Sequence, residues 1–405
     1  MSCLNFRLES TSGLLSSIIL AFLLSIIINI FLLKKFRLII PKALLFYVLG
    51  FFVFWCVGAF SALRMEVFEY NLFSIPIRFF VYFSVSLSVV FILTSALGLD
   101  FYESVFVFLK LIVIVYFLHS LVIFIQFLDP GFRDFLYGVF DVGKTSTSPV
   151  SSFRLGGITG RLPGLSYSHG IACLFSLYLY SVRGSIKYIF AYFVILFSLI
   201  FVARTGIFFG IFSIFIYVFL KNKYFFKSLL LILFTFFLVA SSIWSFGGKI
   251  SNDAEQAVSR TFEIFEVTSR SGKFETASTN DLLDNHWSVV PEETLEILFG
   301  YGAADSAFVG FHNTDVGFLR VVFFSGIVGL VLVVVIHCFI FLYLVKGVDR
   351  SFFALVLFFA IFWFSFNSKD YEIFGGPSLL VLLVLALLKS AGQFNLTSRF
   401  KETRQ

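Results

Sequence analysis

Several polar side chains precede a long apolar stretch in the last third of the chain. Segment 311–330 reads FHNTDVGFLRVVFFSGIVGL, and no charged residue follows it before Lys346. Its chemically useful side chains are those of His312, Asn313, Asp315 and Arg320. His312 or Asp315 could act as a general base, because His, Glu and Asp are common proton acceptors in active sites. A helix starting here would place both on one face; a capped helix start with an interfacial histidine is the alternative.

Arginines recur at the ends of apolar stretches, namely Arg154, Arg161, Arg204 and Arg320. Arg161 lies in GRLPGLSYSHG, where the glycines allow a ligand to approach the backbone and Ser166 and Ser168 could cap the following helix. A helix N-terminus beside an arginine binds anions, and arginine matches phosphate oxygens in a bidentate manner. A diphosphate is therefore a candidate ligand, with His169 as a further contact. Contact of Arg161 or Arg204 with lipid headgroups is the alternative.

Other kinds of catalytic chemistry find no support. The cysteines are Cys3, Cys56, Cys173 and Cys338, without CxxC or Cys/His metal spacing. Patterns for a serine nucleophile, a P-loop, a zinc protease or an EF-hand do not occur. We therefore expect neither a metal nor a cofactor. His119 and His337 lie in apolar stretches and are expected to form helix–helix hydrogen bonds, whereas His286 is expected in a solvated loop.

The element that must position these residues is a bundle of membrane-spanning helices. The chain has 405 residues, of which 59% are hydrophobic and 13% charged, with 62 phenylalanines. Ordinary globular chains carry about 25% charged residues. The apolar stretches fit an all-α polytopic membrane protein with roughly eleven (about 10–12) transmembrane helices of about 20 residues each. No basic stripe interleaved with exposed aromatics suggests nucleic acid as a partner.

The distribution of basic residues predicts which connections lie outside. Lysines and arginines cluster in alternate connections, which marks those connections as cytoplasmic and leaves two long polar loops on the other side. Within these loops we expect short helices at FRDFLYGVF, at NDAEQAVSRTFEIFEV, and at PEETLEILFG between Pro291 and Gly300. The expected parts are N-terminal transmembrane helices 1–128, a first outer loop 129–167, central transmembrane helices 168–245, a large outer loop 246–311, C-terminal transmembrane helices 312–390 and a cytoplasmic tail 391–405.

Four motifs, in order, resemble one protein family. They are GRLPGLSYSHGIACL, ARTGIFFG, EETLEILFGYGAADS and HNTDVGFLRVVFFSGIVGL. Together they make residues 150–330 similar to the O-antigen polymerase and O-antigen ligase superfamily of bacterial inner-membrane proteins. Ala203 stands where the family usually has serine, which affects a supporting hydrogen bond. The resemblance implies that the outer loops are periplasmic.

The resemblance also implies a reaction. A glycan linked to undecaprenyl diphosphate is the donor, a hydroxyl of a second glycan attacks its anomeric carbon, and undecaprenyl diphosphate leaves, with inversion and without a metal. By motif position Arg161 and Arg204 would bind the diphosphate, with Arg154 and Arg320 as further candidates. His312 would be the base or orient the acceptor, and Asp315 competes for that role. The implied partners are lipid-linked oligosaccharides, membrane lipids and, as a further candidate, a chain-length regulator.

Three functions are compared. A polymerase joins lipid-linked repeat units of O-antigen or capsule, a ligase transfers the glycan to lipid A-core, and a transporter or flippase moves it. A transporter predicts short outer loops, polar residues in mid-span and often internal repeats. The chain instead has long outer loops, polar residues near one surface and no visible repeat. Polymerase is preferred over ligase by family habit, because HNTD lies close to the apolar stretch and the chain is rich in phenylalanine.

Overall fold

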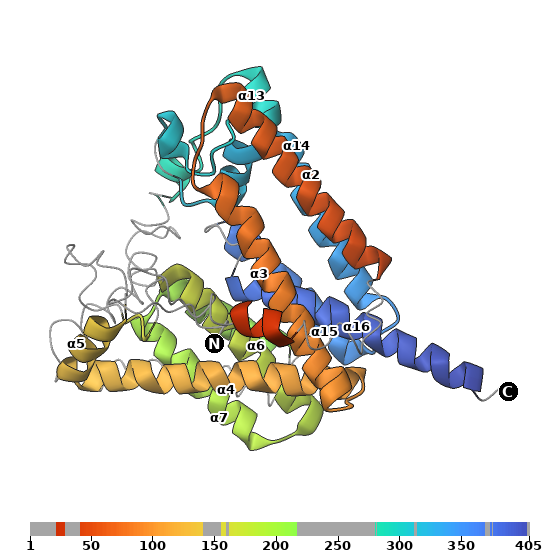
Figure 1. The fold of residues 1–405 in the computed structure, drawn as a ribbon. Helices are drawn as coiled ribbons and strands as arrows, with labels where there is room; N and C mark the ends of the chain where they lie inside the picture. Colours follow the sequence, from red (N-terminus) through yellow and green to blue (C-terminus); the bar gives the residue numbers. More distant parts are fainter. Residues whose placement is uncertain are drawn as a thin grey trace. The chain divides into compact units, whose positions relative to one another are not determined.

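The computed structural model describes residues 22–28, 41–140, 155–158, 162–216, 280, 282–311, 314–368, 373–374 and 376–402 (Figure 1). Within these ranges the chain is helical and contains no strand. Five helices are long and apolar enough to cross a membrane: α2 (Lys42–Met65), α3 (Asn71–Phe91) with its π-helical extension η2 (Ile92–Ala96), α4 (Phe101–Leu128), α14 (Gly317–Val345) and α15 (Arg350–Asn367). The expected all-α class is confirmed for the described residues, five of whose helices could cross a membrane, and the count of about eleven spans stays a prediction.

The described residues fall into two compact units. The first comprises the described residues within 106–216 and 349–362, and the second those within 22–105, 280–348 and 363–402. Helices α4 and α15 contribute to both.

The first unit is built around a buried helix. Its elements are α4 from residue 106, α5 (Pro130–Val139), α6 (Leu162–Arg183), α7 (Ile186–Ser198), η4 (Leu199–Phe201), α8 (Arg204–Phe212) and the first part of α15. Helix α6 is buried from residue 164 to 179 and packs against α7 and α8. The expected short helix at FRDFLYGVF is confirmed as α5, which starts because Asp129 accepts the Phe132 N–H and Pro130 occupies the first turn.

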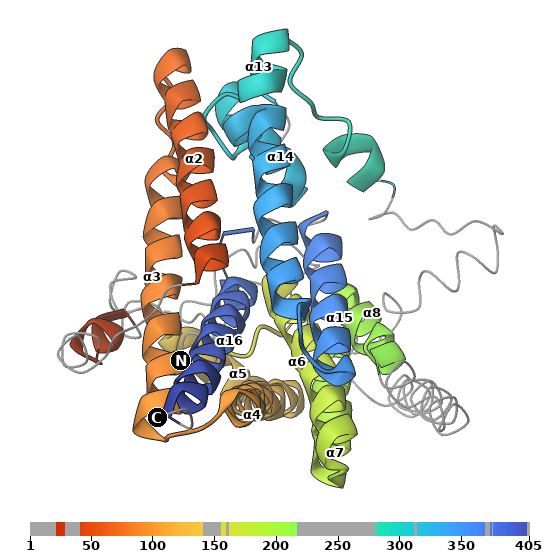
Figure 2. The ribbon, with the colours of Figure 1, turned by 90° about the vertical axis from the view of Figure 1, so that its right-hand side faces the viewer.

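The second unit is organised by the pair α2 and α14, which lie side by side (Figures 1 and 2). It also contains α3, η2, η6 (Leu282–His286), α13 (Thr294–Phe299), η7 (Ser306–Val309) and α16 (Gly376–Glu402). Gly50 and Gly58 let α2 approach α14, since a Cβ there would lie 2.3 Å from Ile336 and 2.1 Å from Phe324. The Tyr47 hydroxyl and His337 Nε2 are 2.9 Å apart between the two helices, as expected for a histidine in a span.

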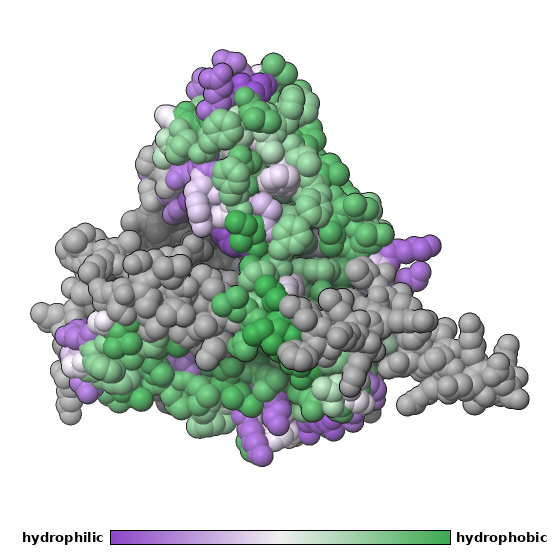
Figure 3. Space-filling view, in the orientation of Figure 1, coloured by the Kyte–Doolittle hydropathy of each residue, from purple (hydrophilic) through white to green (hydrophobic). Residues whose placement is uncertain are grey.

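Apolar side chains cover much of the face drawn in Figure 3, and polar residues gather near α13. Exposed apolar residues occur along α2, among them Leu45, Leu49, Val53, Phe60 and Leu63. A helix that is apolar on its exposed side as well as its buried side is typical of a membrane span. At the end of α14, Lys389 of α16 donates to the Leu344 carbonyl oxygen at 3.0 Å.

Helix α14 is broken inside its apolar length. Gly326 has φ 66° and ψ −169°, which is outside the helical range. The carbonyl oxygens of Phe323 and Phe324 instead accept the N–H groups of Tyr301 (2.7 Å) and Gly302 (3.1 Å). Residues that follow α13 therefore supply the hydrogen bonds that the break removes, as an apolar environment requires.

The break is so closely packed that a methyl group at position 326 should not fit. A Cβ on Gly326 would lie 2.1 Å from the Leu298 carbonyl oxygen, and φ 66° adds backbone strain. We expect Gly326→Ala to lower the free energy of unfolding by about 3 kcal/mol or more. The measurement is the unfolding midpoint in detergent, which should fall strongly. The matched control is Gly310→Ala, where φ is 87° but nothing lies within 4 Å, so only the strain of about 1–3 kcal/mol applies. Equal losses in the two variants would show that close packing at the break contributes nothing.

Candidate functional site

Helices α6 and α8 pack against each other, and their backbones come close near their N-termini. A Cβ on Gly206, in the first turn of α8, would lie 2.5 Å from the Ser166 carbonyl oxygen of α6. Further along, a Cβ on Gly170 would lie 2.6 Å from Phe209, and one on Gly210 would lie 3.6 Å from Cys173. The residue numbers at these contacts increase along both helices. The two helices therefore run in the same direction, and their N-termini lie at the same end.

This end carries the positive ends of two helix dipoles. The first amides of a helix have no partner within it, and the aligned peptide dipoles favour an anion there. Arg161 directly precedes α6 in the sequence and Arg204 is the first residue of α8. The helix break before α8 falls at Ala203, whose extended backbone (φ −166°, ψ 146°) separates η4 from α8. Two of the predicted anion-binding positions are thus adjacent to helix N-termini that the fold brings together.

A short segment of the expected first outer loop, residues 155–158, joins this end. The Leu155 N–H donates to the Phe201 carbonyl oxygen at 2.8 Å. Leu155 follows Arg154 in the sequence, and Phe201 precedes Arg204 by three residues. The described residues that neighbour Arg154, Arg161 and Arg204 in the sequence therefore lie in one part of the first unit. Arg154 and Arg161 themselves lie outside the described residues, and Arg204 is described through its backbone.

Two expectations about this region are wrong. Ser166 and Ser168 are not helix caps, because α6 begins at Leu162 and both lie inside it. The Ser168 hydroxyl donates to the Gly164 carbonyl oxygen within the helix, as buried serines in helices do. His169 is fully buried and pairs with His119 rather than facing a ligand at the helix start.

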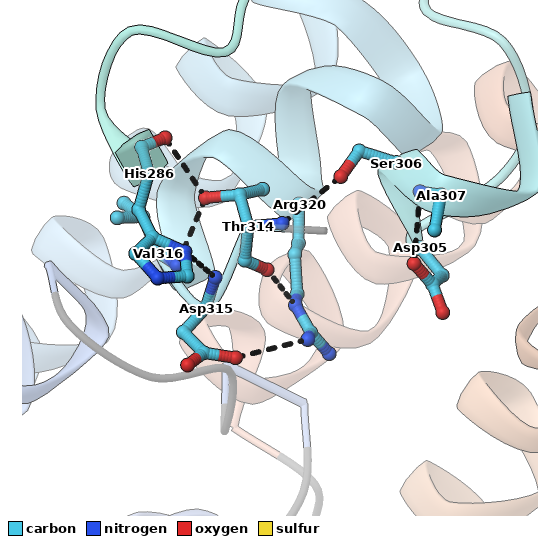
Figure 4. A network of polar contacts seen from close by, with 8 residues as sticks. All are labelled: His286, Asp305, Ser306, Ala307, Thr314, Asp315, Val316 and Arg320. Atoms are coloured by element: carbon cyan, nitrogen blue, oxygen red, sulfur yellow. Dashed lines mark hydrogen bonds and ion pairs between the residues drawn. The ribbon is translucent and has the colours of Figure 1, made fainter. Parts of the chain in front are cut away.

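The second unit contains a polar network around the residues that precede α14 in the sequence (Figure 4). The Asp315 N–H donates to His286 Nδ1 at 3.1 Å, and the Thr314 hydroxyl donates to the His286 carbonyl oxygen at 3.0 Å. On the other side, the Thr314 N–H donates to the Ser306 hydroxyl at 3.0 Å. The guanidinium of Arg320 donates to the Thr314 carbonyl oxygen at 2.7 Å and lies 3.6 Å from the Asp315 carboxylate. The network fixes the residues on either side of Asp315.

The predicted cluster does not form a simple helix start. Asp315 lies before α14, which begins at Gly317, so it is not part of that helix. Its carboxylate is largely exposed, with 66% of its side chain accessible. Arg320 bonds to the backbone and to a carboxylate of its own segment. It therefore stabilises this segment and is also a candidate ligand-binding group. His312 lies outside the described residues.

Sequence reasoning missed the contribution of His286, which it placed in a solvated loop. Its spacing of 29 residues from Asp315 gives no periodic signal, and only the fold shows the contact. Since Nδ1 accepts the Asp315 N–H, the neutral ring carries its proton on Nε2 and can donate from there. His286 thus joins its own segment to the Asp315 backbone.

A partly buried ion pair, also missed, holds the large loop to α2. Arg64 lies 3.2 Å from the Glu296 carboxylate of α13 and donates to the Gly300 carbonyl oxygen at 3.1 Å. Nearby, the Glu69 carboxylate accepts the N–H groups of Ala304 (2.6 Å) and Asp305 (3.2 Å). These bonds put the α2–α3 connection and the end of the large loop at one end of the unit.

Two phenols near the loops stay protonated. Burial raises the pKa of Tyr301, and the carboxylates of Glu296, Glu293 and Glu292 raise it further. Burial also raises the pKa of Tyr137 on α5, although a hydrogen bond with the Gly156 backbone acts in the opposite direction. Neither phenol is therefore a candidate base near neutral pH, and both act as packing and hydrogen-bonding groups.

The role of His286 in holding position 315 can be tested with a pair of substitutions. The amide oxygen of asparagine can replace Nδ1 as an acceptor, whereas phenylalanine cannot. We expect His286→Phe to raise the rate of limited proteolysis within 282–316 about fivefold, the equivalent of about 1 kcal/mol for one lost hydrogen bond. The His286→Asn protein should be cleaved at nearly the wild-type rate. Similar rates for the His286→Phe variant and the wild-type protein would show that the Asp315 N–H bond does not order the segment.

Comparison with known proteins assigns no family and no function to the chain. No family model, curated protein or solved structure matches the chain. The described part of the chain is helical, with several candidate membrane spans and with polar groups at particular helix ends. A function must therefore be argued from these groups and from the motif resemblance.

Proposed function

We propose that the chain is a membrane glycosyltransferase that polymerises polysaccharide repeat units of O-antigen or capsule. It would transfer a glycan from undecaprenyl diphosphate to a hydroxyl of another lipid-linked repeat unit, at the periplasmic face of the bacterial inner membrane. The observation that carries the proposal is the parallel packing of α6 and α8 at Gly206, next to the sequence positions of Arg161 and Arg204. The resemblance of the four motifs to polysaccharide polymerases and ligases supplies the reaction class.

The diphosphate is the group that this arrangement suits. In the proposed reaction the acceptor oxygen forms a bond to the anomeric carbon while the bond from that carbon to the diphosphate oxygen breaks. The bonding electrons leave with undecaprenyl diphosphate, so negative charge develops on it. Two aligned helix N-termini and the guanidinium groups of Arg161 and Arg204 would stabilise that charge without needing to reorganise. Arg154 and Arg320 are further candidates for contacts with the phosphates.

The proton of the acceptor hydroxyl must go to a base. His312 is the proposed base or acceptor-orienting group, with Asp315 as the competing candidate. The network around Thr314 supports a role for this segment, because His286, Ser306 and Arg320 hold it from three directions. A fixed base is effective because proton transfer depends on hydrogen-bond geometry in the reacting complex.

The arginine assignment is tested by charge and geometry together. We expect Arg161→Ala and Arg204→Ala to reduce polymerisation about 100-fold or more, since each would remove a stabilising group for the leaving diphosphate. Arg161→Lys and Arg204→Lys should keep part of the activity, because lysine retains the charge but not the bidentate geometry. The matched control is Arg183→Ala at the opposite end of α6, which should leave activity unchanged. The measurement is polysaccharide chain length in a deletion strain that expresses each variant at equal membrane abundance.

The same deletion strain separates the alternatives. Loss of a polymerase leaves single repeat units on the surface lipid, whereas loss of a ligase leaves core without repeats and long chains on undecaprenyl diphosphate. Accumulation of lipid-linked units on the cytoplasmic side would indicate a transporter. Full-length polysaccharide in both alanine variants would contradict the assignment of the site.

A further inference from the structure

The first unit contains a pair of buried histidines that the proposed reaction does not use. His119 of α4 and His169 of α6 are 2% and 0% exposed. His119 Nδ1 and His169 Nε2 lie 3.3 Å apart, and His169 Nδ1 lies 2.9 Å from the Leu165 carbonyl oxygen. The second ring nitrogen of His119, Nε2, accepts the N–H of Ile158 at 3.3 Å. The pair thus links two helices to the segment that leads into α6.

The hydrogen bonds define the direction of donation through the pair. Because Nε2 of His119 accepts the Ile158 N–H, the neutral ring carries its proton on Nδ1 and donates it to Nε2 of His169. His169 then carries its own proton on Nδ1 and donates to the Leu165 carbonyl oxygen. Every ring nitrogen of the pair has a partner in this arrangement, so the acceptor on His119 has a fixed position.

Several hydrogen bonds hold the segment 155–158, and the one from the Ile158 N–H to His119 is among them. Gln126, also on α4, donates to the Gly157 carbonyl oxygen at 2.9 Å. Gly157 has φ 61°, and a Cβ there would lie 2.2 Å from Nε2 of His119, so only glycine fits beside the imidazole. The Leu155 N–H bond to the Phe201 carbonyl oxygen ties the other end of the segment to the residues before α8.

We propose that His119 is a positioning residue for the diphosphate site: its imidazole holds the Gly157–Ile158 backbone, and thereby the start of α6 at Leu162, in register with the start of α8. This rests on the proposed function, since the ligand held at position 161 is the donor diphosphate. His119 touches neither the donor nor the acceptor. It acts through the backbone of the segment that ends three residues before Arg161.

Three substitutions separate the two hydrogen bonds of His119. Glutamine places an amide oxygen near the position of Nε2 and keeps an acceptor for Ile158. Asparagine reaches the position of Nδ1, keeps a donor for His169 and loses the Ile158 bond. Leucine removes both. The matched control is His337→Leu, which removes an equally buried imidazole from the second unit, where the ring bonds to Tyr47.

The first readout is hydrogen–deuterium exchange at residues 155–158 of the full chain in nanodiscs, which requires no assumption about activity. We expect faster exchange of the Ile158 amide in His119→Leu and His119→Asn, and near wild-type exchange in His119→Gln and His337→Leu. Gly157→Ala, which keeps the histidine but forces the segment away from it, should also exchange faster. Unchanged exchange in His119→Leu would overturn the proposal.

The second readout is the kinetics of glycan transfer from a lipid-diphosphate-linked donor. His119→Leu and His119→Asn should raise the donor KM about tenfold or more, with kcat affected less, because a displaced binding group weakens donor binding. His119→Gln should restore the wild-type KM. Faster exchange without a change in donor KM, or equal KM values for the asparagine and glutamine variants, would overturn the positioning role. Full activity of Arg161→Ala and Arg204→Ala would instead refute the site of the proposed function, while the exchange data still report the His119 contact.

Discussion

The structure depends on one constraint: a helix interrupted in an apolar environment must find partners for the backbone groups that the interruption frees. Unpaired N–H and C=O groups cost several kcal/mol in such surroundings (roughly 2–7), and in a membrane interior no water replaces them. Two such interruptions occur among the described helices, before α8 and inside α14. At each, a loop segment supplies the missing hydrogen bonds. Leu155 bonds to Phe201 in the first unit, and Tyr301 and Gly302 bond to the carbonyls before Gly326 in the second.

This constraint explains why residues far apart in the sequence become neighbours. The segment that repairs the first interruption leads into α6, and the segment that repairs the second leads from α13 towards the network around Thr314. Glycines mark both places, because only a residue without a side chain allows backbone to touch backbone there. Helix interruptions are common where membrane proteins bind charged ligands, since the ends of the half-helices expose their dipoles. The proposed diphosphate site uses the first interruption in this way.

Sequence reasoning predicted the helical membrane architecture well, because composition and the length of apolar stretches determine it directly. It also placed α5, and it placed the end of α13 at Gly300, since caps and glycine stops are local signals. The start of α13 is less well predicted: the helix begins at Thr294, three residues after Pro291. The expected helix within NDAEQAVSRTFEIFEV lies outside the described residues.

The site was less accessible to prediction. Arg204 stood out because a lone charge between apolar stretches is unusual, but Ser166 and Ser168 were mistaken for caps since no local signal showed that α6 begins at Leu162. His286, Glu69 and the pair of Arg64 with Glu296 act through contacts between residues 29 to 236 positions apart, for which one sequence carries no periodic pattern. His119 was correctly expected to form a helix–helix hydrogen bond, whereas its second bond, to Ile158, appears only in the fold.

The most direct measurement is an electron cryo-microscopy structure of the full chain in nanodiscs with a short polyprenyl diphosphate, such as farnesyl diphosphate. The account predicts phosphate density within hydrogen-bonding distance of first-turn amides of both α6 and α8, with the guanidinium groups of Arg161 and Arg204 directed at it. Phosphate density at another part of the chain, with these two arginines facing lipid, would contradict it.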